Sequence, residues 1–423
     1  MAVTLAGNLA SPLAGFLSAP LLARGLGADG RGEAAAATAP LLMLTVVLAL
    51  GLPEAVTYFV ARSTRTRRLV LRTALGAMAV TGACGVLLVW WMRMPLSGDD
   101  PALASLIMVG TAGLLPSLVV GVLRGQAAAL EQWGRIAWEK SINAIGRLGL
   151  VALLYVTDSM TPFSATVVLT VTVVAGGVVY LIPWAAGARV EQATASATAG
   201  EVLGFGMRMW GGTLTGILLS RISQVLMVPL ADTRALGIYV VALQLAEAVL
   251  VVNSAMRDVT MSRMSSTFSA ATLVQTTRVS NLITASSALG LAVCAPWFVP
   301  LLFGHEFDAA VPVVWVLLIG SVLGNAGSVA GAGLVALGRP GLRSLGMAAA
   351  LVVNVSTLVV LTPLWGATGA AIATAAGSFV AGTLNVLWVA PRIGRRPFDF
   401  LLFRGEDVTL FIRTITRIVR RSA

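Results

Sequence analysis

The sequence predicts an all-α polytopic membrane protein with about twelve transmembrane helices. Of its 423 residues, 57% are apolar and only 11% are charged, and the mean hydropathy is +0.89. A water-soluble chain would carry roughly 25% charged residues. The apolar residues also fall into blocks of about 20, the length at which a helix crosses a ~30 Å hydrocarbon core. Water-soluble fold classes are therefore excluded.

Charge clusters, Gly/Pro turns and block length predict six spans in each half of the chain. The first six are expected near 3–23, 36–60, 70–92, 103–123, 141–157 and 163–186, and the second six near 204–230, 236–256, 280–303, 311–337, 344–363 and 366–390. The organisation that follows is an N-lobe at 1–190, an Ala/Thr/Ser-rich linker at 191–203, a C-lobe at 204–390 and a tail at 391–423.

Basic residues between the spans predict the orientation, because Lys and Arg near helix ends stay on the cytoplasmic side. One set of alternate gaps and the tail together hold 22 of these residues, while the other set holds four: Arg24, Arg31, Arg93 and Arg234. Both termini are therefore expected to be cytoplasmic. Most tryptophans, including Trp90, Trp91 and Trp365, fall at predicted span ends, as an interfacial aromatic belt requires.

The composition also limits the chemistry. The net charge of +11 does not indicate nucleic-acid binding, because the arginines lie mostly in short gaps between apolar blocks. Cys84 and Cys294 lie inside apolar blocks and are expected to be buried, so neither a disulfide scaffold nor a Cys-rich metal site is indicated. No nucleophile with its acid and base, Walker A loop or zinc spacing is recognisable. We expect no catalytic activity, no cofactor and no metal.

Two short motifs have structural readings that we favour. The run Gly25 to Gly30 satisfies the G-x-G-x-x-G pattern, but it joins two predicted spans rather than a strand and a helix, so a tight exterior turn is expected there. His305, near Glu306 and Asp308, is a single imidazole in a predicted exterior loop. A solvated loop residue is the favoured reading, with a metal or pH-sensing site as the alternative.

Five ionisable residues lie inside predicted spans: Glu54, Arg147, Arg208, Arg221 and Glu247. Charges within a membrane are costly and usually face a cavity or a partner. Arg208 lies about one turn from the cytoplasmic end, which favours snorkelling of its side chain to the interface. The other four are candidates for substrate contact or for structural ion pairs. Arg221 and Glu247 are predicted at matching depths and are expected to approach each other.

The tail carries apolar residues on one predicted helical face and arginines on another, as a basic amphipathic helix at the membrane surface does. Membrane lipids are its expected partners. A docking site for a cytoplasmic protein is the alternative.

Several stretches resemble the Wzx-type oligosaccharide flippases of the multidrug and oligosaccharidyl-lipid exporter superfamily. In the N-terminal half these are Pro20 to Glu33 and Gly51 to Phe59, and in the C-terminal half they are Leu236 to Tyr239, Leu302 to Phe307 and Ala336 to Pro340. The resemblance covers nearly the whole chain, although each motif is loose and diagnostic only in combination.

The resemblance implies two six-helix lobes around a central cavity, which carries a polyprenyl-diphosphate-linked oligosaccharide from the cytoplasmic to the outer leaflet of a bacterial plasma membrane by alternating access. It also implies that the first, second, seventh and eighth helices line the cavity, which singles out Arg24, Glu54, Arg221 and Glu247. Arg147 is added from its position within a span. Ser223 stands where relatives often carry an acid, which weakens acid-based cation coupling at that position.

The main alternative is a multidrug or cation antiporter of the same superfamily, which would need buried acids more than buried arginines. A membrane glycosyltransferase or polymerase would need a large exterior loop or an acidic motif, and the sequence predicts neither. A peptidoglycan-precursor flippase usually has two further helices.

Overall fold

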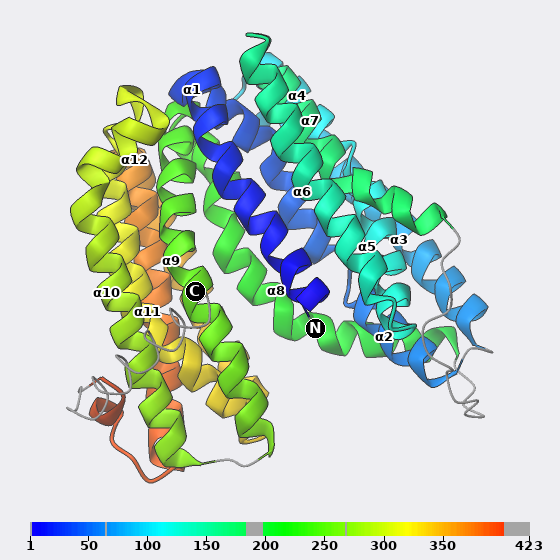
Figure 1. The fold of residues 1–423 in the computed structure, drawn as a ribbon, viewed down its shortest axis with the longest axis vertical. Coiled ribbons are helices and arrows are strands. Elements are labelled where there is room, and N and C mark those ends of the chain that lie inside the picture. The colour runs from blue at the N-terminus through cyan, green and yellow to red at the C-terminus, as the bar shows by residue number, and fades with distance from the viewer. Residues whose placement is uncertain (1, 64–65, 183–197, 267–268, 402–423) are drawn as a thin grey trace. The chain divides into compact units, whose positions relative to one another are not determined.

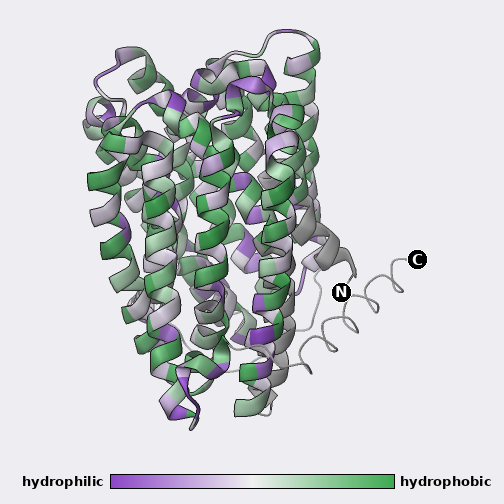
Figure 2. Ribbon diagram, turned by 90° about the vertical axis from the view of Figure 1, so that its left-hand side faces the viewer, coloured by the Kyte–Doolittle hydropathy of each residue, from purple (hydrophilic) through white to green (hydrophobic). Residues whose placement is uncertain are grey.

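The computed structural model describes residues 2–63, 66–182, 198–266 and 269–401, and within these ranges the secondary structure is entirely helical. Hydrophobic residues dominate the helices (Figure 2). The all-α membrane fold predicted from the sequence is confirmed. Residues 191–197 of the linker predicted at 191–203, and residues 402–423 of the tail predicted at 391–423, lie outside the described residues.

The chain divides into two compact units, Met1–Gly237 and Ile238–Ala423. The helices of the first unit are α1 (Ala2–Val47), α2 (Leu52–Arg62), α3 (Arg67–Leu96), α4 (Pro101–Thr111), α5 (Leu114–Ala129), α6 (Trp133–Val156), α7 (Pro162–Ala175), the 3₁₀ helix η1 (Gly176–Leu181) and α8 (Ala199–Leu230). In Figure 1 these helices are coloured from blue through cyan to green. Within this unit α8 packs against α1, α2 and α3. The predicted lobe boundary at residue 190 stays a prediction.

The second unit begins within α9 (Thr233–Ser266). It continues through α10 (Ala270–Phe303), the 3₁₀ helix η2 (His305–Phe307), α11 (Ala310–Ala336), α12 (Pro340–Arg392) and the 3₁₀ helix η3 (Pro397–Phe400). His305 lies in η2, where its Nδ1 is 3.3 Å from Oδ2 of Asp308 and its side chain is exposed. This agrees with the favoured reading of His305 as a solvated residue.

Seven helices in the described ranges are long and apolar enough to span a membrane, and α8 adds an eighth although it bends by 59° between Gly211 and Leu214. Two of the seven, Pro12–Arg62 and Pro340–Arg392, contain 51 and 53 residues, while about 20 suffice to cross the bilayer. Each contains a kink at a glycine with positive φ, Gly27 at 68° and Gly366 at 54°, and Pro12–Arg62 contains a second such glycine, Gly51 at 65°. Gly27 lies in the turn predicted between the first two spans, and Gly366 is the first residue of the span predicted at 366–390. The exact count of twelve stays a prediction.

Two sequence expectations need correction. The span predicted at 36–60 is interrupted between Val47 and Leu52, where Leu50 and Gly51 adopt positive φ of 49° and 65° ahead of Pro53. The cysteines, expected to be buried, are both exposed on the surface of the protein. The physical reason is that lipid is itself an apolar solvent, so a small hydrophobic residue gains little from burial within the protein.

A core in the first unit shows how α1 folds back at Gly27. Leu22, before the kink, and Ala34, after it, are both buried in one cluster with Val151 of α6 and Ala165 of α7. Residues on both sides of the kink therefore pack against the same two helices.

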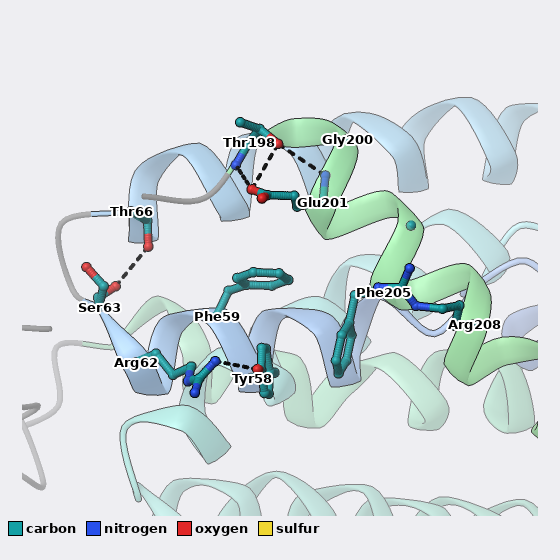
Figure 3. Close-up of a pocket in the computed structure, with 11 residues that line it drawn as sticks. Tyr58, Phe59, Arg62, Ser63, Thr66, Thr198, Gly200, Glu201, Phe205 and Arg208 are labelled. Carbon is teal, nitrogen blue, oxygen red and sulfur yellow. Dashed lines mark hydrogen bonds between the residues drawn. The ribbon is translucent and has the colours of Figure 1, made fainter. Parts of the chain in front are cut away.

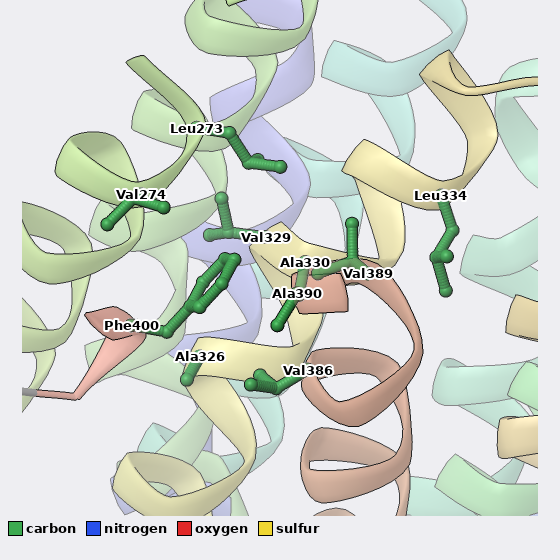
Figure 4. Close-up of a cluster of buried hydrophobic side chains, with 10 residues drawn as sticks. All are labelled: Leu273, Val274, Ala326, Val329, Ala330, Leu334, Val386, Val389, Ala390 and Phe400. Atoms are coloured by element: carbon green, nitrogen blue, oxygen red, sulfur yellow. The ribbon is translucent and has the colours of Figure 1, made fainter. Parts of the chain in front are cut away.

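A second core lies in the second unit, where α10, α11, α12 and η3 meet (Figure 4). Phe400 of η3 is fully buried there, and its carbonyl oxygen accepts a hydrogen bond of 3.3 Å from Asn281. Nearby, α11 and α12 approach closely at Gly327, where an added Cβ would strike the backbone of Gly382. The small-residue run around Gly327 thus permits close helix packing, as the sequence predicts.

Candidate functional site

A cavity of about 650 Å³ lies where the end of α2 faces the first turns of α8, within the first unit (Figure 3). Its lining combines aromatic rings, two arginines and hydroxyl groups: Tyr58, Phe59, Arg62, Ser63, Thr66, Thr198, Gly200, Glu201, Gly204, Phe205 and Arg208. A volume of this size falls in the range of small-molecule sites, roughly 300–1,000 Å³. We refer to it as the α2–α8 pocket.

Three aromatic rings form the apolar part of the α2–α8 pocket. Tyr58 and Phe205 stack with their centroids 4.5 Å apart and their planes 16° from parallel. Phe59 meets both rings edge-on, at 5.2 Å from Tyr58 and 5.8 Å from Phe205. Because the stack joins α2 to α8, any movement between these two helices must break or slide it.

Two arginines provide the charge of the pocket. Arg62 lies one helical turn after Tyr58, donates a hydrogen bond to its hydroxyl oxygen and places Cζ 4.8 Å from its ring centroid. Arg208 lies about one turn after Phe205 on α8. Both side chains are exposed, and in the described part of the chain neither forms an ion pair with a carboxylate. The pocket can therefore accept an anionic group.

The one acid in the α2–α8 pocket is engaged by the helix that carries it. Glu201 Oε2 accepts hydrogen bonds from the backbone N–H of Thr198 at 2.7 Å and from its hydroxyl at 3.0 Å, which forms a capping box. Glu201 lies just before the predicted span at 204–230. The two hydrogen bonds, chiefly the one from the Thr198 backbone, hold the pKa of the Glu201 carboxyl below its usual range. Glu201 thus serves α8 directly, and the two arginines stay available to a ligand.

The sequence-predicted candidates lie elsewhere, and none of them lines the α2–α8 pocket. Arg24 is exposed on α1 just before the Gly27 kink, and Glu54 is exposed in the first turn of α2, where a carboxylate suits the positive helix N-terminus. Arg221 is partly buried on α8 in the first unit, whereas Glu247 is exposed on α9 in the second. Their pairing and their substrate role stay predictions.

Arg147 is the fifth candidate, and it points into the first unit. Its side chain is partly buried, and its Nε donates a hydrogen bond of 3.1 Å to the hydroxyl oxygen of Ser18 on α1. Ser18 is itself fully buried and donates to the Gly15 carbonyl oxygen. The structure therefore brings Arg147 together with α1.

The sequence did not predict the α2–α8 pocket as a site. Arg62 is one of the 22 basic residues that predict the orientation, and Arg208 was interpreted only as a snorkelling residue. The available signal was the pairing of an aromatic residue with an arginine one turn later on two helices, Tyr58 with Arg62 and Phe205 with Arg208. Spacing alone does not show that the two helices meet.

The comparisons with known proteins agree with this architecture. The model of a family described as polysaccharide biosynthesis protein matches residues 1–268. None of the curated proteins is a significant match. Among solved structures, an inward-facing multidrug resistance MATE family transporter of the MOP superfamily is 14% identical, with a TM-score of 0.76 over 92% of this chain and 98% of that chain.

Two further structures have the same fold. The lipid II flippase MurJ, in an inward closed conformation, is 13% identical, with a TM-score of 0.75 over 99% of this chain and 93% of that chain. A MOP superfamily transporter from Pyrococcus furiosus is 14% identical, with a TM-score of 0.60 over 93% and 94% of the two chains. At these identities the likeness is one of fold.

Proposed function

Because this chain belongs to the polysaccharide biosynthesis protein family, we propose that it moves a polyprenyl-diphosphate-linked oligosaccharide to the outer leaflet of a bacterial plasma membrane by alternating access, for cell-surface polysaccharide biosynthesis. Its partners would be this lipid-linked substrate, the membrane lipids and proteins of polysaccharide assembly. The observation that carries the proposal is the α2–α8 pocket, which combines stacked aromatic rings with two arginines.

The chemistry of the pocket suits the headgroup of such a substrate. Arginine is the side chain best matched to phosphate oxygens, because its planar fork donates two parallel hydrogen bonds. Arg62 and Arg208 would hold the diphosphate, and the apolar face of a sugar ring would pack on the Tyr58–Phe205 stack. The lipid tail would stay in the bilayer. The basic-residue asymmetry predicts that this end of α2 and α8 faces the cytoplasm, where the substrate is loaded.

The pocket would also link loading to movement. The stack of Tyr58 on Phe205 joins α2 to α8, so a sugar that inserts between the rings would separate the two helices. A ligand shifts a conformational equilibrium only through contacts that differ between the states. Arg24 and Arg221 would then contact the diphosphate later, during passage through the central cavity.

A vesicle flipping assay with a polyprenyl-diphosphate glycan tests the proposal. The Arg62→Gln/Arg208→Gln variant should transport at least about tenfold more slowly, because hydrogen bonds to a charged group contribute roughly 1.5–3 kcal/mol and 1.4 kcal/mol is a factor of ten. The corresponding double lysine variant should recover part of the rate. Arg234→Gln is the matched control, since Arg234 pairs with the exposed Asp29 at 3.3 Å, away from the pocket. Full transport by a well-inserted double glutamine variant would overturn the proposal.

The alternative, a multidrug or cation antiporter, has support from the fold shared with the MATE transporter. The polarity of the α2–α8 pocket counts against it, because a cationic drug needs an available acid and Glu201 is held in a capping box. The same vesicles can be tested with a cationic dye. Dye transport without glycan transport would move the assignment to the antiporter.

A further inference from the structure

A second charged site lies inside the first unit and is unrelated to the α2–α8 pocket. Arg31, counted from the sequence as an exterior-loop charge, lies within α1, and only 3% of it is exposed. Its Nε atom is buried with no hydrogen-bond acceptor. A guanidinium remains ionised in proteins, so this side chain cannot escape the cost of burial by losing its proton.

The charge that acts on Arg31 is a second cation, the partly buried Arg147 of α6. The two arginines belong to the same packed region: Leu22 of α1, Ala34 of α1 and Val151 of α6 share one core cluster, and Arg147 lies one helical turn before Val151. Ser18 adds a hydroxyl, 3.1 Å from Arg147 Nε.

Neither arginine has an acidic partner. In the described ranges of the chain, no carboxylate lies within 4.0 Å of the guanidinium nitrogens of Arg31 or Arg147. Two like charges that repel in a region shielded from water are strongly unfavourable unless an opposite charge compensates them. The two acids next to Arg31 in the sequence do not supply this charge: Asp29 pairs with Arg234, and Glu33 forms no ion pair with a described residue.

We propose that Arg31 and Arg147 form a binding site for a small monovalent inorganic anion of the halide class inside the first unit. One bound anion halves the net charge of the arginine pair and provides the acceptor that Arg31 Nε lacks. Ser18 donates its own hydroxyl proton to the Gly15 carbonyl oxygen and accepts from Arg147 Nε, so its role is to position Arg147.

The packing around Arg31 limits the size of the ligand. The glycines on either side are in tight contact: a Cβ at Gly30 would lie 3.3 Å from Pro162, and one at Gly32 would strike the carbonyl oxygen of Thr233. Backbone packed this closely on both sides of Arg31 favours a single small ion over a glycan or a diphosphate headgroup. The proposed ion is therefore separate from the transported substrate.

Thermal unfolding of the full-length protein in detergent micelles tests the site. At constant ionic strength, gluconate is replaced stepwise by chloride. The melting temperature of the unaltered protein should rise and saturate, by roughly 2–4 °C once chloride exceeds its dissociation constant several-fold. Arg31→Gln should abolish the chloride response and, with the repulsion removed, should melt in gluconate at or above the temperature of the unaltered protein. Arg234→Gln, at the exposed pair, should keep the response.

A second measurement does not depend on any variant. Crystals of the unaltered protein grown in bromide should show an anomalous peak between the guanidinium groups of Arg31 and Arg147. The proposal is overturned if chloride leaves the melting temperature unchanged, if Arg31→Gln responds to chloride as the unaltered protein does, or if bromide is absent from the site.

Discussion

The ion pair between Arg124 of α5 and Glu139 of α6 should respond unequally to the loss of its two members. Arg124 donates from Nε and from the terminal nitrogen to the two carboxylate oxygens of Glu139, at 2.9 and 2.6 Å. The Tyr180 hydroxyl of η1 donates to the same carboxylate at 2.8 Å. The Glu139 side chain is 0% exposed, whereas that of Arg124 is 43% exposed.

This difference in exposure determines how much each substitution lowers the free energy of unfolding. Arg124→Leu leaves a fully buried carboxylate without its cation, a situation that costs about 3–5 kcal/mol. Glu139→Leu leaves an arginine that can still reach water, so its cost should be closer to the 1–3 kcal/mol of a lost charged hydrogen bond. The Arg124→Leu variant should therefore be less stable than the Glu139→Leu variant by about 2 kcal/mol, and the double variant should be more stable than Arg124→Leu alone.

Denaturant unfolding of each variant in micelles measures these differences, with Arg72→Leu, at an exposed position on α3, as the control for loss of an arginine. A double-mutant cycle then gives the coupling energy between the two residues. Equal costs for the two single variants, or a double variant whose cost is the sum of the singles, would refute the reasoning from exposure.

Two predictions concern the second unit and use the same unfolding measurement. Phe400→Ala should lower the free energy of unfolding by about 3–5 kcal/mol, because this ring is fully buried among α10, α11 and α12. Phe398→Ala, at a ring 70% exposed, should have little effect. Similar effects at both positions would show that η3 is not anchored by Phe400. Gly327→Val should destabilise by about 1–3 kcal/mol or more, because its Cβ would strike Gly382, while Gly290→Val, with nothing within 4 Å of its Cβ, should not. Equal tolerance of the two valines would contradict the close helix approach.

The sequence predicts the fold well because a membrane allows few solutions. Backbone groups in lipid must be satisfied within their own segment, so an apolar block of about 20 residues is expected to be helical. The turns around Gly27 and Gly366 were predictable for a related reason: helical blocks too long for one crossing contain a residue that accepts positive φ. The interruption at Leu50 and Gly51 was not predicted, because the block at 36–60 is about the length of one span and Gly51 and Pro53 are both tolerated within membrane helices.

The candidate site was less predictable, because it depends on which helices touch. Tyr58 and Arg62 lie about 150 residues before Phe205 and Arg208 in the chain, and only the packing of α2 on α8 brings them into one pocket. Only charges inside predicted spans were candidates for the interior of the protein. Arg147 met this condition, whereas Arg31 lies outside every predicted span and is nevertheless buried.

Arg31 and Arg124 also bear on the predicted orientation, since the basic-residue rule treats each arginine as a side chain at the membrane surface. Arg31 is buried in the first unit, and Arg124 is bound to a buried carboxylate, so neither is free to serve that role. Removing both from the comparison leaves 21 basic residues on the predicted cytoplasmic side and three on the other. The asymmetry becomes stronger in proportion, because the smaller set loses a quarter of its members. Cytoplasmic termini therefore remain the prediction even when arginines that serve the interior of the protein are excluded.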